Sequence, residues 1–391
     1  MQRRCRPGYP LQPTNTATRD RRAVIGCRRA IRTPVKIRND QQLAESEPSV
    51  VRYKQRRLVG RMQSLGFDLR QEAILETLTQ DAHKSSDIEG ERLDLEQVRS
   101  SVGRRLGMDI GGLRHAEDEV EGVVEMMLDA TGNYDQPLTV DRLWGWQAAL
   151  LPTGRSRMRP IIVGGWRDDR TGPMQVISGP IGKERVHFEA PPAERIDSEM
   201  DAFLRWFNEP SDTDEILRAA LAHLWFVTIH PFDDGNGRIA RAIADMALAR
   251  SEGNSQRFYS MSSQIRVERR GYYRILERTQ QGTPDITEWM EWFLACLGRA
   301  IDGAETTLAS VLTKARFWQQ VEGVPLNARQ RRVLGRLLDG FEGKLTSSKW
   351  AKLAKCSQDT ALHDITALVD RGVLVRSSAR GRSTSYSLHS G

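Results

Sequence analysis

The chain has 391 residues, 28% of them charged, and a net charge of +7, which is enough material for two or three domains with a buried core. Its mean hydropathy is −0.52, and its longest nearly apolar run, 219–229, is shorter than the about 18 residues that a membrane helix needs. The first 40 residues lack the apolar stretch of a secretory signal. Four widely spaced cysteines form no C-x-x-C pair, which favours a reducing compartment. We therefore expect a cytoplasmic protein without a membrane partner.

The positive charge belongs to the two ends of the chain. Residues 1–40 carry 11 Lys and Arg against 2 Asp and Glu, and residues 327–391 carry 12 against 5. The middle, 41–326, carries 35 against 44 and is mildly acidic. A basic segment suits nucleic acid or an acidic surface, but it is also typical of a solvated tail.

The first half of the chain changes pattern several times. Residues 1–50 are Arg-rich without helical or strand periodicity, so we expect a disordered basic tail. Residues 51–135 carry helical stripes of apolar side chains and form the expected N-terminal helical region. Between 160 and 190, short apolar runs separated by Gly and Pro indicate a β-hairpin. Helical periodicity returns in 195–208 and 213–230.

The second half is predicted to be helical up to a small terminal module. A long helix is expected to open at Thr283-Pro284, with Thr as the N-cap and Pro at the first helical position. Gly323 to Pro325 makes a linker. Beyond the linker the pattern predicts three helices and a strand pair, at 327–338, 347–355, 358–371 and around 379–382.

This order of elements predicts a winged helix-turn-helix domain at 322–391, with the helix at 358–371 in the recognition position. The basic charge of the module favours nucleic acid, as do three arginines on or near the wing, Arg376, Arg380 and Arg382. The acidic residues of the third helix oppose phosphate contact. They are Asp359, Asp364 and Asp370. DNA binding and protein docking therefore both stay open.

The stretch with the most chemical information is 230–241, which reads His-Pro-Phe-Asp-Asp-Gly-Asn-Gly-Arg-Ile-Ala-Arg. The proline after His230 should end a helix there. A Gly-Asn-Gly loop before a new helix makes an anion site, and Arg238 and Arg241 share one face of that helix. Asp234 beside the anion site suggests a hard cation such as Mg²⁺, and His230 is the available general base. Together these residues predict phosphoryl or nucleotidyl transfer.

The same stretch resembles the Fic-domain signature H-P-F-x-[DE]-G-N-G-R-x-x-R at every defined position. The resemblance implies transfer of AMP from ATP, with Mg²⁺, to a Ser, Thr or Tyr hydroxyl of a target protein, with release of pyrophosphate. It implies that His230 deprotonates the hydroxyl and that Asp234 holds the metal. The implied nucleotide-binding residues are Gly235, Asn236 and Gly237 at the α-phosphate, Arg238 at the phosphates and Arg241 at the γ-phosphate.

A second motif lies upstream of the signature. Ser85 and Glu89 are four residues apart and share a helical face, and Gly90 can cap the end of that helix. The motif resembles the Fic inhibitory sequence [ST]-x-x-x-E-[GN]. The resemblance implies that Glu89 pairs with Arg241 and blocks the seat of the γ-phosphate. A chance helix end is the alternative.

The hairpin segment 174–180 resembles the flap of the family, on which the backbone of the target docks as an added strand. The docking residues that the resemblance implies are Val176, Ile177 and Ser178. An ordinary edge hairpin is the alternative. Tyr272 and Tyr273 could stack on adenine, but we interpret them as core residues and leave them out of the site.

The sequence thus predicts a mainly α protein, with a Fic-type helical core and a small β-hairpin flap at 136–321. The leading hypothesis is a protein adenylyltransferase autoinhibited by Glu89. One alternative is a Fic enzyme that removes AMP or transfers another phosphate-containing group. Another is a DNA-binding transcriptional regulator that uses the core as a nucleotide sensor. Self-modification and a homodimer are further expectations.

Overall fold

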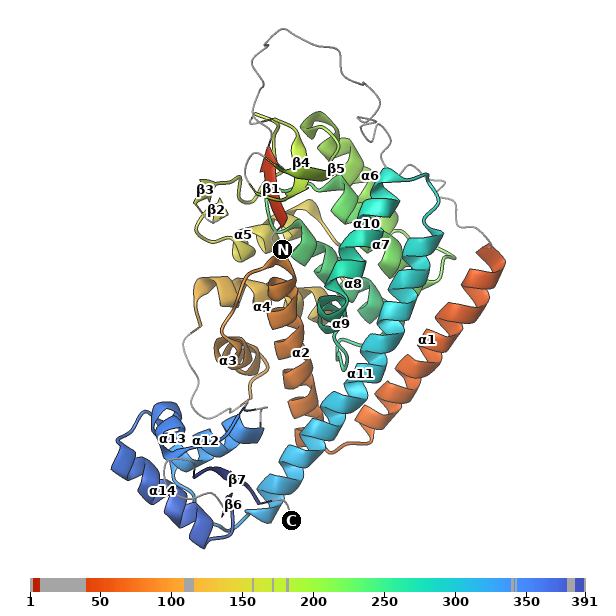
Figure 1. Ribbon diagram of the computed structural model, residues 1–391. Coiled ribbons are helices and arrows are strands. Elements are labelled where there is room, and N and C mark those ends of the chain that lie inside the picture. The colour runs from red at the N-terminus through yellow and green to blue at the C-terminus, as the bar shows by residue number, and fades with distance from the viewer. Residues whose placement is uncertain are drawn as a thin grey trace. The chain divides into compact units, whose positions relative to one another are not determined.

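Figure 1 shows the computed structural model of the chain, which describes residues 3–7, 40–108, 116–156, 158–170, 172–180, 183–338, 341, 343–377 and 384–389. Contacts between residues group the chain into two units. The larger unit holds most of the chain up to Leu308, and the smaller unit holds the chain from Ala309 onward.

The larger unit is mainly helical. Its helices are α1 (Asp40–Gln63), α2 (Phe67–Glu89), α3 (Leu95–Arg105), α4 (Asp118–Gly132), α5 (Val140–Leu150), α6 (Ile196–Asn208), α7 (Glu215–Ile229), α8 (Asn236–Glu252), α9 (Met261–Val267), α10 (Arg269–Gln281) and the first part of α11 (Thr287–Gln320). Several begin at a side chain that accepts a hydrogen bond from the first helical turn. These N-caps include Asp94, Thr139, Asp214 and Ser260.

Helices α7 and α8 form the centre of the larger unit. Helix α7 is buried from Ile216 to Ile229 apart from Leu221, which is half-buried. Helix α8 is rich in buried alanines, whose small side chains let neighbouring helices approach closely: Ala240, Ala242, Ala244, Ala247 and Ala249. Helices α2, α4 and α9 also contact α8. The loop between α7 and α8 is therefore anchored in well-packed helices on both sides.

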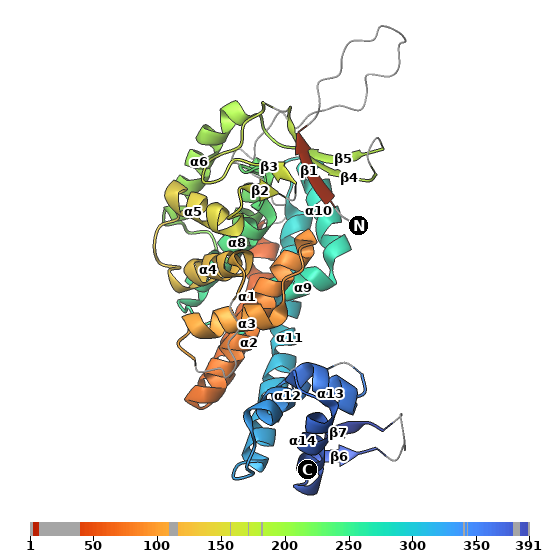
Figure 2. The same ribbon diagram turned by 90° about the vertical axis from the view of Figure 1, so that its left-hand side faces the viewer.

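A three-stranded antiparallel sheet lies beside α10 (Figure 2), in the order β1 (Arg3–Pro7), β4 (Met174–Ser178) and β5 (Arg185–Glu189). Strands β4 and β5 form the hairpin predicted between 160 and 190. Strand β1 pairs along the other edge of β4, from Arg3 opposite Ser178 to Pro7 opposite Met174. A second, very short hairpin consists of β2 (Arg155–Ser156) and β3 (Arg159–Pro160), and a 3₁₀ turn η1 (Ala193–Arg195) precedes α6.

The prediction of a disordered tail at 1–50 is wrong for two segments. Strand β1 is ordered by main-chain pairing, which needs no alternation of apolar side chains and so leaves no sequence signal. Helix α1 begins at Asp40 and contains Pro48 in its interior, a residue that normally argues against a helix. Residues 8–39 of the predicted tail lie outside the described residues.

The long helix α11 starts at Thr287 rather than at Thr283-Pro284 as predicted. The N–H of Thr287 donates to Asp285 Oδ1 at 3.0 Å, so Asp285 supplies the side-chain acceptor at the start of the helix. Thr283 instead closes the turn before it, where its Oγ1 accepts from the N–H of Asp285 at 3.4 Å. Two capping residues compete in this segment, and the later one begins the helix.

The smaller unit contains three helices and a strand pair in the predicted order: α12 (Ala328–Leu338), α13 (Ser347–Ala354), α14 (Gln358–Asp370), β6 (Leu374–Arg376) and β7 (Tyr386–Leu388). Its core includes Val333, Trp350 and Ile365, all fully buried. Leu345 makes an isolated bridge to Tyr386 beside the strand pair. Arg380 and Arg382 of the predicted wing lie outside the described residues. A winged-helix identity stays a prediction.

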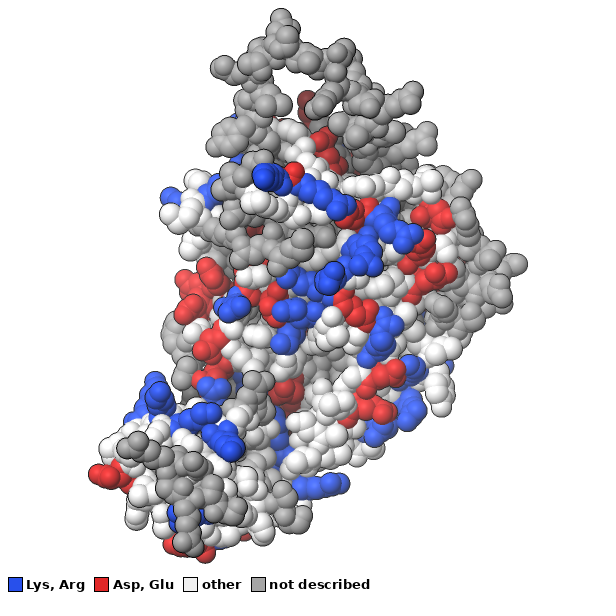
Figure 3. Space-filling model, viewed as in Figure 1, with Lys and Arg blue, Asp and Glu red and all other residues white. Residues whose placement is uncertain are grey.

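No helix among the described residues is both long enough and apolar enough to cross a bilayer. On the face shown in Figure 3, Lys and Arg side chains are intermixed with Asp and Glu over the larger unit. Some of them form ion pairs between helices, such as Arg61 of α1 with Glu305 of α11 at 2.6 Å. Pairs this exposed contribute little to stability.

Candidate active site

The signature loop starts where α7 ends. Ile229 is the last helical residue, and His230 follows in the left-handed conformation with a φ of 52°. Arg167 holds this turn with two hydrogen bonds. Its side-chain Nε donates to the carbonyl oxygen of His230 at 2.8 Å, and its backbone N–H donates to the carbonyl oxygen of Pro231 at 2.9 Å. Arg167 was missed from the sequence, because it lies 63 residues before His230 and belongs to no recognisable motif.

The imidazole of His230 is buried at the wall of a pocket, with 6% of the residue exposed. Its Nδ1 lies 3.2 Å from the carbonyl oxygen of Val227, which favours a proton on Nδ1 and the lone pair on Nε2. Burial lowers the pKa of His230 to about 4, and the positive charge of Arg167 acts in the same direction. The side chain is therefore neutral at neutral pH and able to accept a proton.

The side chain of Asn236 holds the loop together from within. Its Oδ1 accepts from the N–H of Phe232 at 3.0 Å, and its Nδ2 donates to the carbonyl oxygen of Phe232 at 2.7 Å. Phe232 is fully buried and anchors this part of the loop. Gly235 has a φ of 90°, which glycine adopts without strain. The role of Asn236 at the α-phosphate, which the Fic resemblance implies, stays a prediction, and its amide fixes the loop that precedes α8.

Asp234 lies at the wall of the same pocket. Its Oδ1 accepts from the N–H of Gly235 at 2.6 Å, and its Oδ2 accepts from the hydroxyl of Ser156 on β2. Ser156 was not predicted as a site residue. Asp233, the neighbouring carboxylate, instead accepts from the N–H of Ile162 at 2.9 Å and does not line the pocket. Among the described residues no group of three or more His, Cys, Asp or Glu could hold a metal by itself.

Arg241 is buried and contacts the end of α2 with all three of its guanidinium nitrogens. Nη1 donates to Glu89 Oε1 at 2.9 Å, Nε donates to the hydroxyl of Ser85 at 2.9 Å, and Nη2 donates to the carbonyl oxygen of Ser85 at 2.8 Å. Burial opposes the charge of Arg241, but Glu89 raises its pKa on balance. The structure thus brings together the two residues that the sequence paired, 152 residues apart.

The carboxylate of Glu89 occupies the space in front of the first turn of α8. A Cβ at Gly237 would lie 2.1 Å from Glu89 Oε1 and 3.4 Å from Arg241 Nη1, so only glycine allows this approach. The hydroxyl of Tyr273 donates to Glu89 Oε2 at 3.3 Å and lies 3.2 Å from the carbonyl oxygen of Ile88. A helix N-terminus favours an anion, and here Glu89 supplies one.

The other signature arginine contacts a second acidic residue beyond the helix cap. Nη1 of Arg238 donates to Oε2 of Glu91, which was not predicted as a site residue. Only 2% of the Arg238 side chain is exposed, against 42% of the Glu91 side chain. Both arginines of the signature therefore have a carboxylate from the same short segment, 89–91, as a partner.

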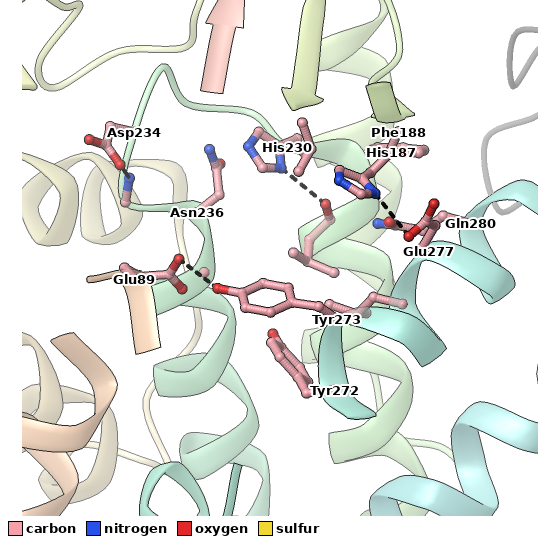
Figure 4. A pocket seen from close by; sticks show the side chains of 15 residues that line it. Glu89, His187, Phe188, His230, Asp234, Asn236, Tyr272, Tyr273, Glu277 and Gln280 are labelled. Atoms are coloured by element: carbon pink, nitrogen blue, oxygen red, sulfur yellow. Dashed lines mark hydrogen bonds and ion pairs between the residues drawn. The ribbon is translucent and has the colours of Figure 1, made fainter. Parts of the chain in front are cut away.

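The pocket has a cavity volume of about 80 Å³, which is well below the about 300–1,000 Å³ of typical small-molecule sites. Figure 4 shows Glu89, His230, Asp234 and Asn236 around one part of it, with the ring of Tyr273 crossing towards Glu89. Its further lining includes Val176, Val227, Tyr272, Leu276 and Gln280. Tyr272 is buried, as predicted for a core residue, and both Tyr272 and Tyr273 also line the pocket. Arg238 and Arg241 are not part of the lining, although both are described.

The β4–β5 hairpin is fixed against α10 by a short network of side chains. The hydroxyl of Ser178 lies 2.5 Å from His187 Nε2, and His187 Nδ1 lies 2.9 Å from Glu277 Oε2. Ile177 and Ser178 are buried, and of the three predicted docking residues only Val176 lines the pocket. The edge of β4 that a docked strand would use is paired with β1.

Two family descriptions match the chain. Residues 137–248 match "Fic/DOC family", and residues 36–108 match "Domain of unknown function (DUF4172)". A similar solved structure, a Fic domain containing signaling protein from Bacteroides thetaiotaomicron, covers 66% of this chain and 97% of its own at a TM-score of 0.50 and 20% identity. That likeness concerns the fold.

Curated relatives carry names of nucleotide transferases. A protein adenylyltransferase Fic from Nematostella vectensis is 28% identical over 60% of this chain and 51% of its own length. A uridine 5'-monophosphate transferase from Xanthomonas campestris pv. campestris is 35% identical over 29% of this chain and 21% of its own. The chain thus matches about half the length of the first relative and a fifth of the second. The match to the Fic/DOC family thus rests on residues 137–248, which are less than half of this chain.

Proposed function

We propose that the protein transfers AMP from ATP to a hydroxyl side chain of a target protein. The observation that carries the proposal is a neutral, buried histidine at the wall of a pocket that also contains the N-terminus of α8 and Asp234. Base, anion site and carboxylate at one pocket are what nucleotidyl transfer requires. Relatives named protein adenylyltransferase support AMP as the transferred group, and the relative named UMP transferase makes UTP the alternative donor.

In this proposal Nε2 of His230 takes the proton of the target hydroxyl as its oxygen attacks the α-phosphorus and pyrophosphate leaves. The N-terminus of α8 at Gly237 faces the charge that develops on the α-phosphate. Asp234 fits a Mg²⁺ ion held by one carboxylate and phosphate oxygens, and such an ion would neutralise phosphate charge. Arg238 and Arg241 would contact the outer phosphates once their carboxylate partners have moved.

The contact between Glu89 and Arg241 supports autoinhibition. Glu89 lies over Gly237 and pairs with Arg241 at 2.9 Å, so a triphosphate and this carboxylate would compete for the same cations. Ser85 and Gly90 contribute through the second contact to Arg241 and through the helix cap. In this proposal the described arrangement is the inhibited one.

Intact-mass analysis after incubation with ATP and Mg²⁺ tests both parts of the proposal. Wild type, Glu89→Gly, and Glu89→Gly with His230→Ala are compared, with a protein mixture from the native host as the source of targets. We expect added AMP, on the protein itself or on a target, with Glu89→Gly alone. The experiment is run with ATP and then with UTP. If none of the three proteins gives a modified product with either nucleotide, although nucleotide binding is intact, the transferase proposal is wrong.

The edge of β4 is the proposed docking edge for the target backbone. Because β1 pairs with that edge, a target strand would have to replace β1. A chain without residues 1–9 should then modify a target faster than the full chain does. Equal rates for the two chains would contradict docking at β4.

A second activity, removal of AMP from a modified protein, is favoured by one observation. Glu89 lines the pocket beside Asn236 and Gly237, where a carboxylate could orient water for attack on a phosphate ester. In that case wild type would remove AMP that the Glu89→Gly variant had added.

For the terminal module, DNA binding stays a prediction, and α14 itself carries no Lys or Arg.

A further inference from the structure

The contact between Glu91 and Arg238 extends the control of the site beyond the single glutamate of the inhibitory motif. Glu91 lies two residues after Glu89, outside the motif. The inference rests on the proposed function, because it concerns how the same nucleotide site is kept closed.

The turn at the C-terminal cap of α2 places the carboxylates of Glu89 and Glu91 against arginines of α8. Gly90 has a φ of 89°, its N–H donates to the carbonyl oxygen of Asp87, and the N–H of Glu91 donates to that of Ser86. These two bonds form the glycine-based helix end in which the chain reverses sharply. Glu89 before the reversal contacts Arg241, and Glu91 after it contacts Arg238.

The remaining donors of Arg238 indicate what its guanidinium is built to bind. Nε and Nη2 are buried and have no hydrogen-bond partner among the described residues. Leaving buried donors of a charged group unpaired is costly. These two nitrogens form the planar fork that matches two oxygens of a phosphate. Glu91 occupies the third nitrogen, Nη1.

The charges around Glu91 indicate that it blocks a phosphate rather than helping to bind one. Burial raises the pKa of Glu91, the negative charges of Asp234 and Glu89 raise it further, and Arg238 opposes this rise. Glu89 and Asp234 line the pocket, and Glu91 lies close enough to both to sense their charge. A triphosphate brought into the same space would be repelled by Glu91 as well as by Glu89.

The preceding turns of α2 are held by contacts with α9. Asp81, two turns earlier, accepts from the N–H of Ser262 at 3.1 Å, and Asp87 pairs with Arg266 at 2.6 Å. Both contacts tie α2 to α9. Residues 89–91 contact α8 through the two ion pairs with Arg238 and Arg241.

We propose that Glu91 is a second inhibitory residue, which withholds Arg238 from the outer phosphates of a nucleotide while Glu89 withholds Arg241. A nucleoside triphosphate must displace both carboxylates, and because Gly90 joins them they leave as one segment. Removing Glu89 alone then opens only half of the phosphate site. A nucleoside monophosphate, which lacks the outer phosphates, does not sense Glu91.

Nucleotide affinity tests the proposal directly. The dissociation constants of ATP and of AMP are measured by calorimetry, with Mg²⁺ present and His230→Ala in every variant so that turnover does not consume ATP. Glu91→Gln, Glu89→Gln, the double variant and the unaltered parent are compared. Glu194→Gln, which removes an exposed carboxylate elsewhere in the larger unit, is the matched control for charge.

We expect Glu91→Gln to raise ATP affinity by about threefold to tenfold, as suits a partly exposed ion pair, and to leave AMP affinity unchanged. The double variant should bind ATP more tightly than either single variant. Unchanged or weaker ATP binding in Glu91→Gln, with a melting temperature like that of the parent, would overturn the proposal, since weaker binding would mean that Glu91 orients Arg238 for the phosphates.

The outcomes separate this inference from the proposed function. Higher ATP affinity in Glu91→Gln, together with no AMP transfer by Glu89→Gly, would leave Glu91 as a nucleotide gate on a protein that is not a transferase. AMP transfer by Glu89→Gly with no effect of Glu91→Gln on affinity would leave the transferase and remove the second inhibitory residue.

Discussion

The signature loop, 230–241, and the end of α2, 85–91, meet at one pocket but are held in different ways. The loop is fixed largely by its own residues, since Asn236 bonds twice to Phe232 and Asp234 bonds to the N–H of Gly235. The side chains at the end of α2 are fixed by arginines about 150 residues away. The support of the loop is therefore mainly local, whereas the contacts of Glu89 and Glu91 depend on arginines distant in the sequence.

The largest expected effect comes from breaking the internal support of the loop. Asn236→Ala removes both hydrogen bonds to the buried backbone of Phe232, and unsatisfied buried groups of this kind cost about 1–3 kcal/mol each. We expect the free energy of unfolding to fall by about 2–4 kcal/mol in urea titrations. Asn236→Asp, which keeps the acceptor alone, should lose less. A stability equal to wild type would mean that the loop is not self-supporting.

The next largest effect is a pH dependence of stability that is due to His230 in the signature loop. His230 has a pKa of about 4 in the folded protein because of burial and Arg167, against about 6.5 when unfolded. Between these values the unfolded state binds more protons, so stability is complete above pH 6.5 and is lost as the pH falls towards 4. We expect up to about 3 kcal/mol from His230.

The contribution of His230 to the free energy of unfolding is measured by comparing wild type with His230→Ala. The comparison uses urea unfolding midpoints at several pH values between 4 and 7. The variant should show a flatter slope, although His223, whose pKa burial lowers to about 3, still contributes in the same direction. His363→Ala, at an exposed position of α14, should keep the slope of wild type. Parallel curves for wild type and His230→Ala would contradict a buried, neutral His230.

The smallest expected effect comes from loosening the end of α2. A Cβ at Gly90 has open space, but the φ of 89° strains any other residue, by about 1–2 kcal/mol. Gly90→Ala should therefore release both carboxylates in part and raise ATP affinity severalfold. Gly253→Ala, at the cap of α8 with a φ of 59° and open space, is the matched control, and it should lose similar stability without changing ATP affinity. Equal ATP affinities in Gly90→Ala and Gly253→Ala would mean that the end of α2 does not control nucleotide binding.

Several parts of the site could be predicted because their signals are local. The proline after His230 ended α7, and the spacing of Ser85 and Glu89 put both on the face of α2 that contacts Arg241. Local signals also failed where two of them compete. Thr283 and Asp285 both resemble helix caps, and the hydrogen bond of Thr287 went to Asp285.

Other parts of the site left no readable signal. Ser156 contacts Asp234 from a two-residue strand, and Arg167 holds the carbonyl oxygen of His230 from a loop. Tyr273 looked like an ordinary core aromatic until its hydroxyl was found beside Glu89. Glu91 stands outside the inhibitory motif and is identified only by its contact with Arg238.

The sequence by itself determined the residues of the candidate site, because His230, the start of α8 and two arginines lie within twelve residues and are arranged by short-range backbone geometry. The tertiary structure decided which distant segments meet at the candidate site. The pairing of β1 with β4 and the meeting of α2 with α8 depend on packing between segments far apart in the chain, and such contacts follow from the whole fold rather than from any local pattern.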